Sequence, residues 1–133
     1  MLEVAQNEQS NNARPEIKDP LTDISKYDTI LLGYPIWYTN LPNIVKAFLE
    51  SLDFEGKTIY PFNTHEGSEM GNSIKEIKKC APKAIVKNGF SISGTSARTI
   101  DSHEHIKNWL HKILLKIKNL ILSKENHFTD LIK

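Results

Sequence analysis

The chain has 133 residues, of which 39% are hydrophobic, and a formal net charge of +1, values typical of one ordinary globular domain. Seventeen basic and sixteen acidic residues leave no excess charge that would attract nucleic acid or an anionic membrane, so we expect neither as a partner. The single cysteine, Cys80, cannot form an internal disulfide, and no apolar stretch is long enough to span a bilayer. A cytoplasmic location is therefore expected.

The first half of the chain predicts a strand, a loop and a helix. Residues 1–26 are polar and are predicted to form a leader or tail. Residues 27–32 are a short apolar run that enters the loop Gly33-Tyr34-Pro35-Ile36-Trp37-Tyr38, which is typical of a buried strand. Apolar residues at helical spacing then predict a helix over 41–52.

The second half continues the alternation. Residues 58–62 predict a second strand, 70–81 a helix that Pro82 stops, and a third strand begins at 84–86. A continuous apolar stripe predicts a last helix over 101–121, followed by a tail at 123–133. Alternating strands and helices indicate an α/β domain over 27–122, an open parallel sheet with helices on both faces.

Two loops are candidate binding sites, because ligands of open α/β sheets bind outside the carboxyl ends of the strands. The first is the aromatic loop after the first strand. The second is Thr64-His65-Glu66-Gly67-Ser68-Glu69-Met70-Gly71, after the second strand. From the residues alone, Trp37 and Tyr38 fit packing over the sheet end as well as they fit a ligand platform. The small residues of the second loop fit plain turn chemistry.

Taken together and in this order, the GYPIWY and THEGSEMG motifs resemble the flavodoxin family. The similarity extends from Ala13 to the last helix and includes the segment Phe54-Glu55-Gly56-Lys57-Thr58. The resemblance implies an open, parallel, flavodoxin-like α/β sheet with strand order 2-1-3-4-5, which holds FMN without a covalent bond. It implies FMN binding with electron transfer or flavin-dependent reduction.

The resemblance also assigns roles to particular residues of the two loops. It implies that the first loop lies against the isoalloxazine ring and that the second contacts the pyrimidine side of the ring. The cofactor-binding residues implied are Pro35, Ile36, Trp37, Tyr38, Thr64, His65, Gly67 and Ser68. No catalytic residue is implied.

The chain departs from the family at its amino end. Family members begin with a further strand, a Gly-rich and hydroxyl-rich phosphate loop, a helix and a second strand, whereas residues 1–26 contain no glycine and only three hydroxyl residues. We therefore expect an amino-terminally truncated domain with about three main strands. We also expect weak or absent FMN binding by the isolated chain, and either homo-oligomers or a complementing amino-terminal fragment. The alternative function is a non-catalytic remnant or interaction module that needs a partner chain to bind flavin.

We expect the hydroxyl residues at 93–97 and the histidines of the last helix to have structural roles. The residues Ser93-Gly94-Thr95-Ser96-Ala97 follow the last strand and are predicted to be a connector. The histidines at 103, 105 and 111 lack the spacing of three or four that places two metal ligands on one helix face, so no metal site is predicted.

Overall fold

The computed structural model describes residues 12–36 and 40–132, and for residue 100 and residues 119–132 it describes the backbone alone. The chain divides into two compact units, Met1–Ala97 and Arg98–Lys133, and each is described by itself. The first unit contains the sheet, two helices and both candidate loops.

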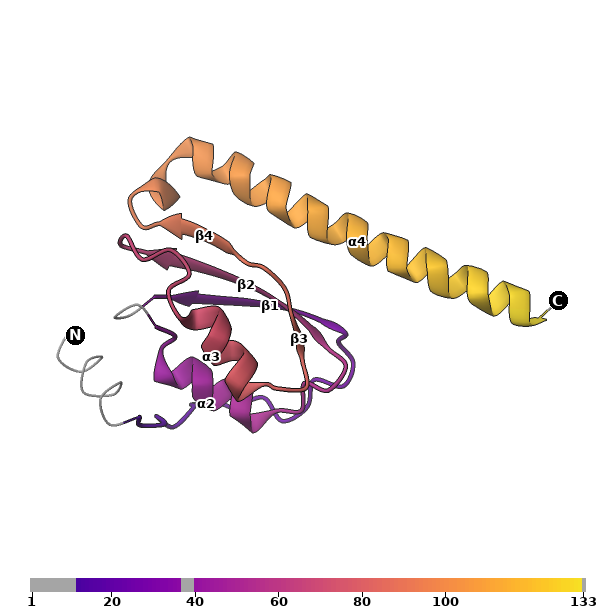
Figure 1. Ribbon diagram of the computed structural model, residues 1–133, viewed down its shortest axis with the longest axis horizontal. Coiled ribbons are helices and arrows are strands. Elements are labelled where there is room, and N and C mark those ends of the chain that lie inside the picture. Colours follow the sequence, from indigo (N-terminus) through magenta and orange to yellow (C-terminus); the bar gives the residue numbers. More distant parts are fainter. Residues whose placement is uncertain (1–11, 37–39, 133) are drawn as a thin grey trace. The chain divides into compact units, whose positions relative to one another are not determined.

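The sheet has four strands, and every pairing in it is parallel (Figure 1). The strands are β1 (Thr29–Pro35), β2 (Thr58–His65), β3 (Ile85–Val86) and β4 (Phe90–Ser93). β2 is central, because β1 pairs with one of its edges and both β3 and β4 pair with the other. The predicted parallel α/β architecture with few strands is confirmed.

The predicted third strand is split in two, and Pro61 explains the gap. β3 pairs with β2 as far as Ile59, and β4 begins to pair at Phe62. The oxygen of Ile59 accepts a hydrogen bond of 2.9 Å from Lys87, so Pro61, two residues further, has its backbone directed to the same edge of β2. Proline has no N–H group to donate to a neighbouring strand. Pro61 therefore occupies a position of β2 that faces the gap between β3 and β4, where no described strand accepts a hydrogen bond from it.

Two helices, α2 (Asn43–Ser51) and α3 (Ser73–Cys80), lie on the same face of the sheet (Figure 1). Alternate residues of β1 and β2 point to that face, as the two-residue period of a strand requires. The apolar side chains buried between sheet and helices form one core, consisting of Ile24, Leu32, Tyr34, Leu41, Leu49, Phe54, Ile59, Ile77 and Ala81. Ile24 lies within the predicted polar leader, so part of that segment packs with the domain.

The opposite face of the sheet is apolar but less covered. Leu31 of β1 is 47% exposed and Phe62 of β2 is 39% exposed. β1 is also an edge strand, since within the described residues only β2 pairs with it. The sheet of the first unit thus presents an open edge along β1 and an apolar surface beside it.

Several elements are longer than their sequence patterns predict. β1 continues through Pro35, so the first three residues of the predicted aromatic loop belong to the strand, where they pair with residues 62–64. Beyond the sheet, the short 3-10 helix Ser96–Arg98 leads to α4 (Ile100–Ile132). α4 continues through residues 123–132, the predicted tail, because no proline or glycine interrupts them. Within the described residues, no helix is both long and apolar enough to cross a membrane.

Candidate functional site

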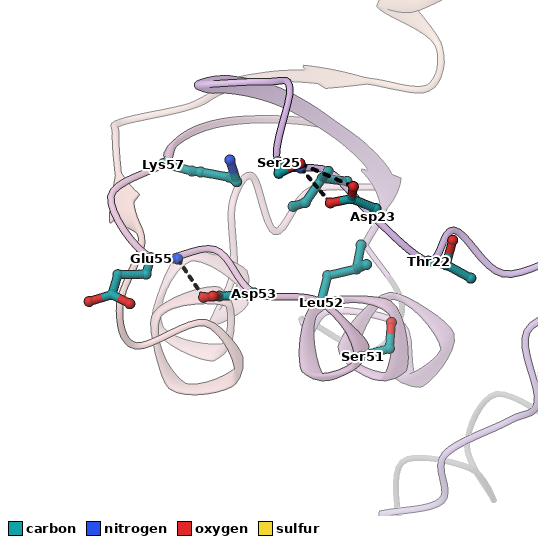
Figure 2. A pocket seen from close by; sticks show the side chains of 9 residues that line it. Thr22, Asp23, Ser25, Ser51, Leu52, Asp53, Glu55 and Lys57 are labelled. Carbon is teal, nitrogen blue, oxygen red and sulfur yellow. Dashed lines mark hydrogen bonds between the residues drawn. The ribbon is translucent and has the colours of Figure 1, made fainter.

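A polar cavity of about 380 Å³ lies at the amino ends of β1 and β2, the edge opposite the predicted loops (Figure 2). Its two aspartates accept hydrogen bonds from residues two positions further along the chain. Asp23 accepts bonds from the amide and hydroxyl of Ser25 at 2.8 and 3.0 Å, and Asp53 accepts the amide of Glu55 at 3.0 Å. The bond from the Ser25 amide is the main cause that lowers the pKa of Asp23. These contacts are turn chemistry, and the cavity is not the candidate site.

The two predicted loops meet at the carboxyl edge of the sheet. Pro35 ends β1 and is exposed, and the next residue, Ile36, packs against the core. The amide of Ile36 donates a 2.9 Å hydrogen bond to the oxygen of Thr64 at the end of β2. The predicted residues Pro35 and Ile36 are therefore adjacent to the predicted residues Thr64 and His65. Trp37 and Tyr38 lie outside the described residues.

The second loop turns sharply after β2. The amide of Gly67 donates to Nδ1 of the His65 side chain at 2.9 Å, and the oxygen of His65 accepts the amide of Gly94 at 2.9 Å. Gly67 has φ +119°, a conformation that glycine adopts without strain. The amide of Gly71 closes the far end of the loop on the oxygen of Ser68 at 2.9 Å. The loop is thus held at the edge of the sheet by side-chain and backbone bonds.

Beneath the second loop lies a buried polar network that the sequence reasoning missed. The hydroxyl of Ser73, at the start of α3, donates to the oxygen of Met70 at 2.6 Å and lies 2.8 Å from the hydroxyl of Tyr34. A serine hydroxyl has one proton, so Tyr34 is the donor in the second bond. Burial raises the pKa of Tyr34, and its interactions with Ser73 and Asn63 oppose that shift in part. The network joins β1 directly to the start of α3.

Asn63 extends this network to β4. It is buried in β2, where its amide nitrogen lies 2.8 Å from the sulfur of Met70 and its oxygen accepts the hydroxyl of Ser91 at 2.8 Å. The available signal was a polar residue at an inward position of a strand, since buried polar side chains need partners. That pattern points to a network but does not identify its members.

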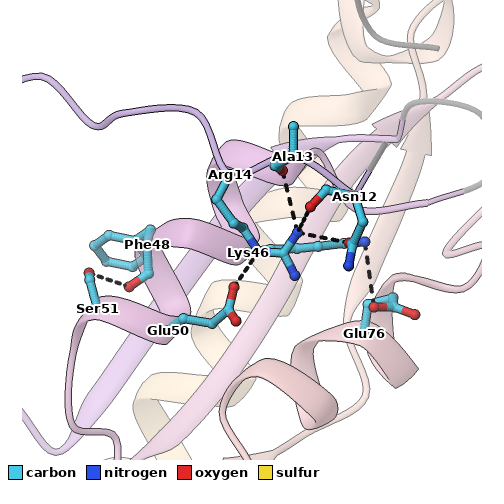
Figure 3. A network of polar contacts seen from close by, with 8 residues as sticks. All are labelled: Asn12, Ala13, Arg14, Lys46, Phe48, Glu50, Ser51 and Glu76. Carbon is cyan, nitrogen blue, oxygen red and sulfur yellow. Dashed lines mark hydrogen bonds and ion pairs between the residues drawn. The ribbon is translucent and has the colours of Figure 1, made fainter. Parts of the chain in front are cut away.

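The helix that follows the second loop is fastened to α2 by an ion pair (Figure 3). Lys46 of α2 is buried, and its ammonium group lies 3.5 Å from a carboxylate oxygen of Glu76 in α3. On the outer side of α2, Arg14 pairs with Glu50 and so attaches the segment before the sheet. Both ion pairs thus connect elements that flank the candidate site.

The predicted connector, residues 93–97, forms a turn after β4. The hydroxyl of Ser93 donates to the hydroxyl of Ser96 at 2.8 Å and accepts its amide at 3.1 Å, which closes the turn that leads to the 3-10 helix. Within the part of the chain that the structure describes, no three His, Cys, Asp or Glu side chains gather as metal ligands would.

The fold and the edge at which the loops meet define a class, the open α/β proteins that bind a ligand at the carboxyl ends of parallel strands. A family model described as Flavodoxin matches residues 3–113, and the chain belongs to the flavodoxin family. The predicted flavodoxin-like fold is thereby confirmed. No functionally curated protein matches the chain.

Three solved structures are similar to the chain. A candidate flavoprotein of Bacteroides uniformis is 34% identical, with a TM-score of 0.69 over 81% of this chain and 66% of its own. One of Bacteroides eggerthii is 36% identical, with a TM-score of 0.64 over 84% of this chain and 65% of its own. A flavoprotein of Lactobacillus acidophilus in complex with FMN is 21% identical, with a TM-score of 0.54 over 72% of this chain and 64% of its own, and supports the fold alone. The chain thus spans just under two thirds of these structures.

Proposed function

We propose that the chain carries the isoalloxazine-binding part of an FMN site at the carboxyl ends of β1 and β2, and that it takes part in electron transfer or flavin-dependent reduction. The observation that supports this best is the bond between the amide of Ile36 and the oxygen of Thr64, which holds the two ring loops side by side. A bound flavin supplies the redox chemistry, and the protein orients the ring and tunes it.

The residues of the two loops fit a flat ring. Apart from Gly67 itself and its two chain neighbours, no heavy atom of the described residues lies within 4 Å of the position that a Cβ of Gly67 would occupy, so the backbone there leaves room for a ligand. Pro35 stiffens the backbone where β1 enters the first loop, and Thr64 and Ser68 add hydroxyl groups that donate or accept hydrogen bonds. In the proposal Trp37 and Tyr38 stack on the ring, which contributes about 0.5 to 1.5 kcal/mol beyond the buried area. Membership of the flavodoxin family and the similarity to the two Bacteroides flavoproteins support a flavin cofactor.

The phosphate of FMN has no comparable cradle in the sequence before β1, because residues 1–26 contain no glycine. We therefore expect the isolated chain to bind FMN weakly and to discriminate little between FMN and riboflavin. Each hydrogen bond to a charged phosphate would otherwise contribute about 1.5 to 3 kcal/mol. Titration of both ligands, followed by flavin fluorescence, measures the difference. Tight FMN binding with much weaker riboflavin binding would show that a phosphate site exists.

The ring platform is tested by Trp37→Ala, with Tyr27→Ala as its matched control. Tyr27 is an exposed aromatic residue before β1, at the amino end of that strand. If Trp37 stacks on the flavin, its variant loses flavin binding and keeps its urea midpoint, whereas the control keeps both. If Trp37 is a packing residue, the variant loses about 3 kcal/mol of stability. A large loss of stability with unchanged flavin binding would rule out the proposed role.

The second candidate is an interaction module that binds flavin only together with a partner chain. It is favoured by the open edge of β1 and by Leu31, which is 47% exposed beside that edge. An exposed apolar edge strand pairs readily with another chain. A chain that retains no yellow flavin at any pH after incubation with FMN and removal of the free ligand, and that associates with itself, would favour this candidate. A yellow monomer would favour the first proposal.

A further inference from the structure

His65 holds the second loop through a ring nitrogen. Its Nδ1 accepts the amide proton of Gly67 at 2.9 Å, across a turn of two residues. A ring nitrogen accepts a hydrogen bond only when it carries no proton, so this contact requires a neutral imidazole with its proton on Nε2. The bond therefore specifies both the charge and the tautomer of His65.

The ends of the loop are fixed independently of the imidazole. The backbone oxygen of His65 accepts the amide of Gly94, and the amide of Gly71 donates to Ser68, each at 2.9 Å. Gly67 lies between these anchors with φ +119°, and it is exposed. Between these anchors, the bond to Nδ1 attaches the Gly67 backbone to the His65 side chain.

Among the described residues of the second loop, β4 and the end of β1, the ionisable groups beside His65 come from its own loop. The carboxylate of Glu66 reaches over Gly94, where an oxygen lies 2.5 Å from the position of a Cβ, and Glu69 follows in the same loop. His65 is paired with Ser93 of β4, and β4 contains no ionisable side chain. At the end of β1, neither Pro35 nor Ile36 is ionisable. Carboxylates keep their charge over the range in which imidazoles change theirs, about pH 5 to 8.

We propose that His65 is a pH-dependent positioning residue: the neutral imidazole holds the Gly67 backbone in place, and protonation of Nδ1 releases it. The loop is ordered when His65 is neutral and loses this bond as the pH falls. If this loop contacts flavin, which rests on the proposed function, the affinity for flavin falls when the bond between His65 and Gly67 is lost.

The first test uses the unaltered chain without flavin. Nitrogen chemical shifts of the imidazole at pH 8 are expected to show the proton on Nε2. The Gly67 amide signal is expected to titrate together with the His65 ring, and its hydrogen exchange, corrected for intrinsic rates, to become about fivefold to tenfold faster below the transition, the loss expected for one hydrogen bond. A proton on Nδ1 at pH 8, or a Gly67 amide that does not respond to the ring, would overturn the proposal.

Three variants separate positioning from other causes. Asn accepts the amide two residues further on through its side-chain oxygen and does not titrate, so His65→Asn is expected to keep the loop bond and to abolish its pH dependence. His65→Ala is expected to show the fast Gly67 exchange at every pH. Glu66→Gln is expected to titrate as the unaltered chain does. A His65→Asn chain whose Gly67 amide still titrates would contradict the proposal.

Flavin titrations distinguish this inference from the proposed function. If flavin binds, its affinity should fall on acidification in the unaltered chain and stay level in His65→Asn. If no flavin binds at any pH while the Gly67 amide follows His65, the proposed function fails and the positioning role stands. If flavin binds with the same pH dependence in both chains, the positioning role fails and the proposed function stands.

Discussion

The hydroxyl of Tyr34 lies 2.8 Å from the hydroxyl of Ser73, a residue 39 positions further along the chain. This bond connects the end of the edge strand β1 to the first residue of α3, immediately after the second loop. Ser73 is fully buried. The contact therefore couples the two halves of the candidate site beneath their surface.

Replacement of Tyr34 by Phe should cost about 1 kcal/mol, the usual contribution of one buried hydrogen bond. The cost stays modest because the hydroxyl of Ser73 keeps its bond to the oxygen of Met70. Tyr60→Phe is the matched control, since within the described part of the chain the Tyr60 hydroxyl makes no hydrogen bond. Urea denaturation of both variants measures the difference. Equal losses would show that the Tyr34 bond contributes nothing specific.

The stability of the chain should also depend on Tyr34 at alkaline pH. Burial raises the pKa of Tyr34 above its ordinary value of 10.0. Below pH 10.0 the hydroxyl of Tyr34 keeps its proton in both the folded and the unfolded chain, and Tyr34 makes its full contribution to the free energy of unfolding. As the pH rises above 10.0, the unfolded chain ionises first and the folded state loses stability. Urea denaturation between pH 9 and about pH 11 should give a shallower decline for Tyr34→Phe than for the unaltered chain. Parallel declines would contradict this assignment.

The ion pair between α2 and α3 should matter more than the pair on the outer side of α2. Glu76→Gln leaves the ammonium group of Lys46, whose side chain is 7% exposed, without its partner, and should cost about 1 to 3 kcal/mol. Glu50→Gln removes a pair whose Arg14 side chain is 34% exposed, and should cost less than about 1 kcal/mol. Thermal and urea denaturation of the two variants decides. A larger loss for Glu50→Gln would reverse this ranking.

Gly89 and Gly33 should respond differently to alanine. A Cβ on Gly89 would lie 2.4 Å from the backbone oxygen of Pro61, which cannot move without displacing β2, and the expected cost is about 1 to 3 kcal/mol. A Cβ on Gly33 would lie 2.3 Å from the end of the Phe62 ring, a half-exposed side chain that can swing aside. Its expected cost is below about 1 kcal/mol. Urea midpoints give the comparison, and equal costs would mean that the gap at Pro61 is not closely packed.

The open edge of β1 should make the chain associate. Leu31 is 47% exposed on this strand, and sedimentation should therefore show dimers or larger species. Leu31→Lys should shift them toward monomer or unfolded chain. Leu21→Lys, a change at a leucine that is 59% exposed before the strand, should not. A folded monomer at high concentration, with protected amide hydrogens along β1, would show that the edge is covered within one chain.

The sequence predicted the elements that depend on local pattern. The two-residue and 3.6-residue periods identified β1, α2, β2 and α3, and the order of strands and helices predicted a parallel sheet. The two motifs also placed Pro35, Ile36, Thr64 and His65 at one edge, because the carboxyl ends of parallel strands coincide. Their roles toward flavin, and those of Trp37, Tyr38, Gly67 and Ser68, stay predictions.

By itself, then, the sequence determined the class of fold, the order of its elements and the family, since these follow from periodicity and from motifs read along the chain. Only the tertiary structure decided which side chains and backbone groups contact one another across the fold. It extended β1 to Pro35, divided the third strand opposite Pro61, joined Tyr34 to Ser73 and brought the Gly67 amide to Nδ1 of His65. A side-chain hydrogen bond depends on distances of tenths of an ångström between residues whose relative positions exist only after the sheet and helices have packed.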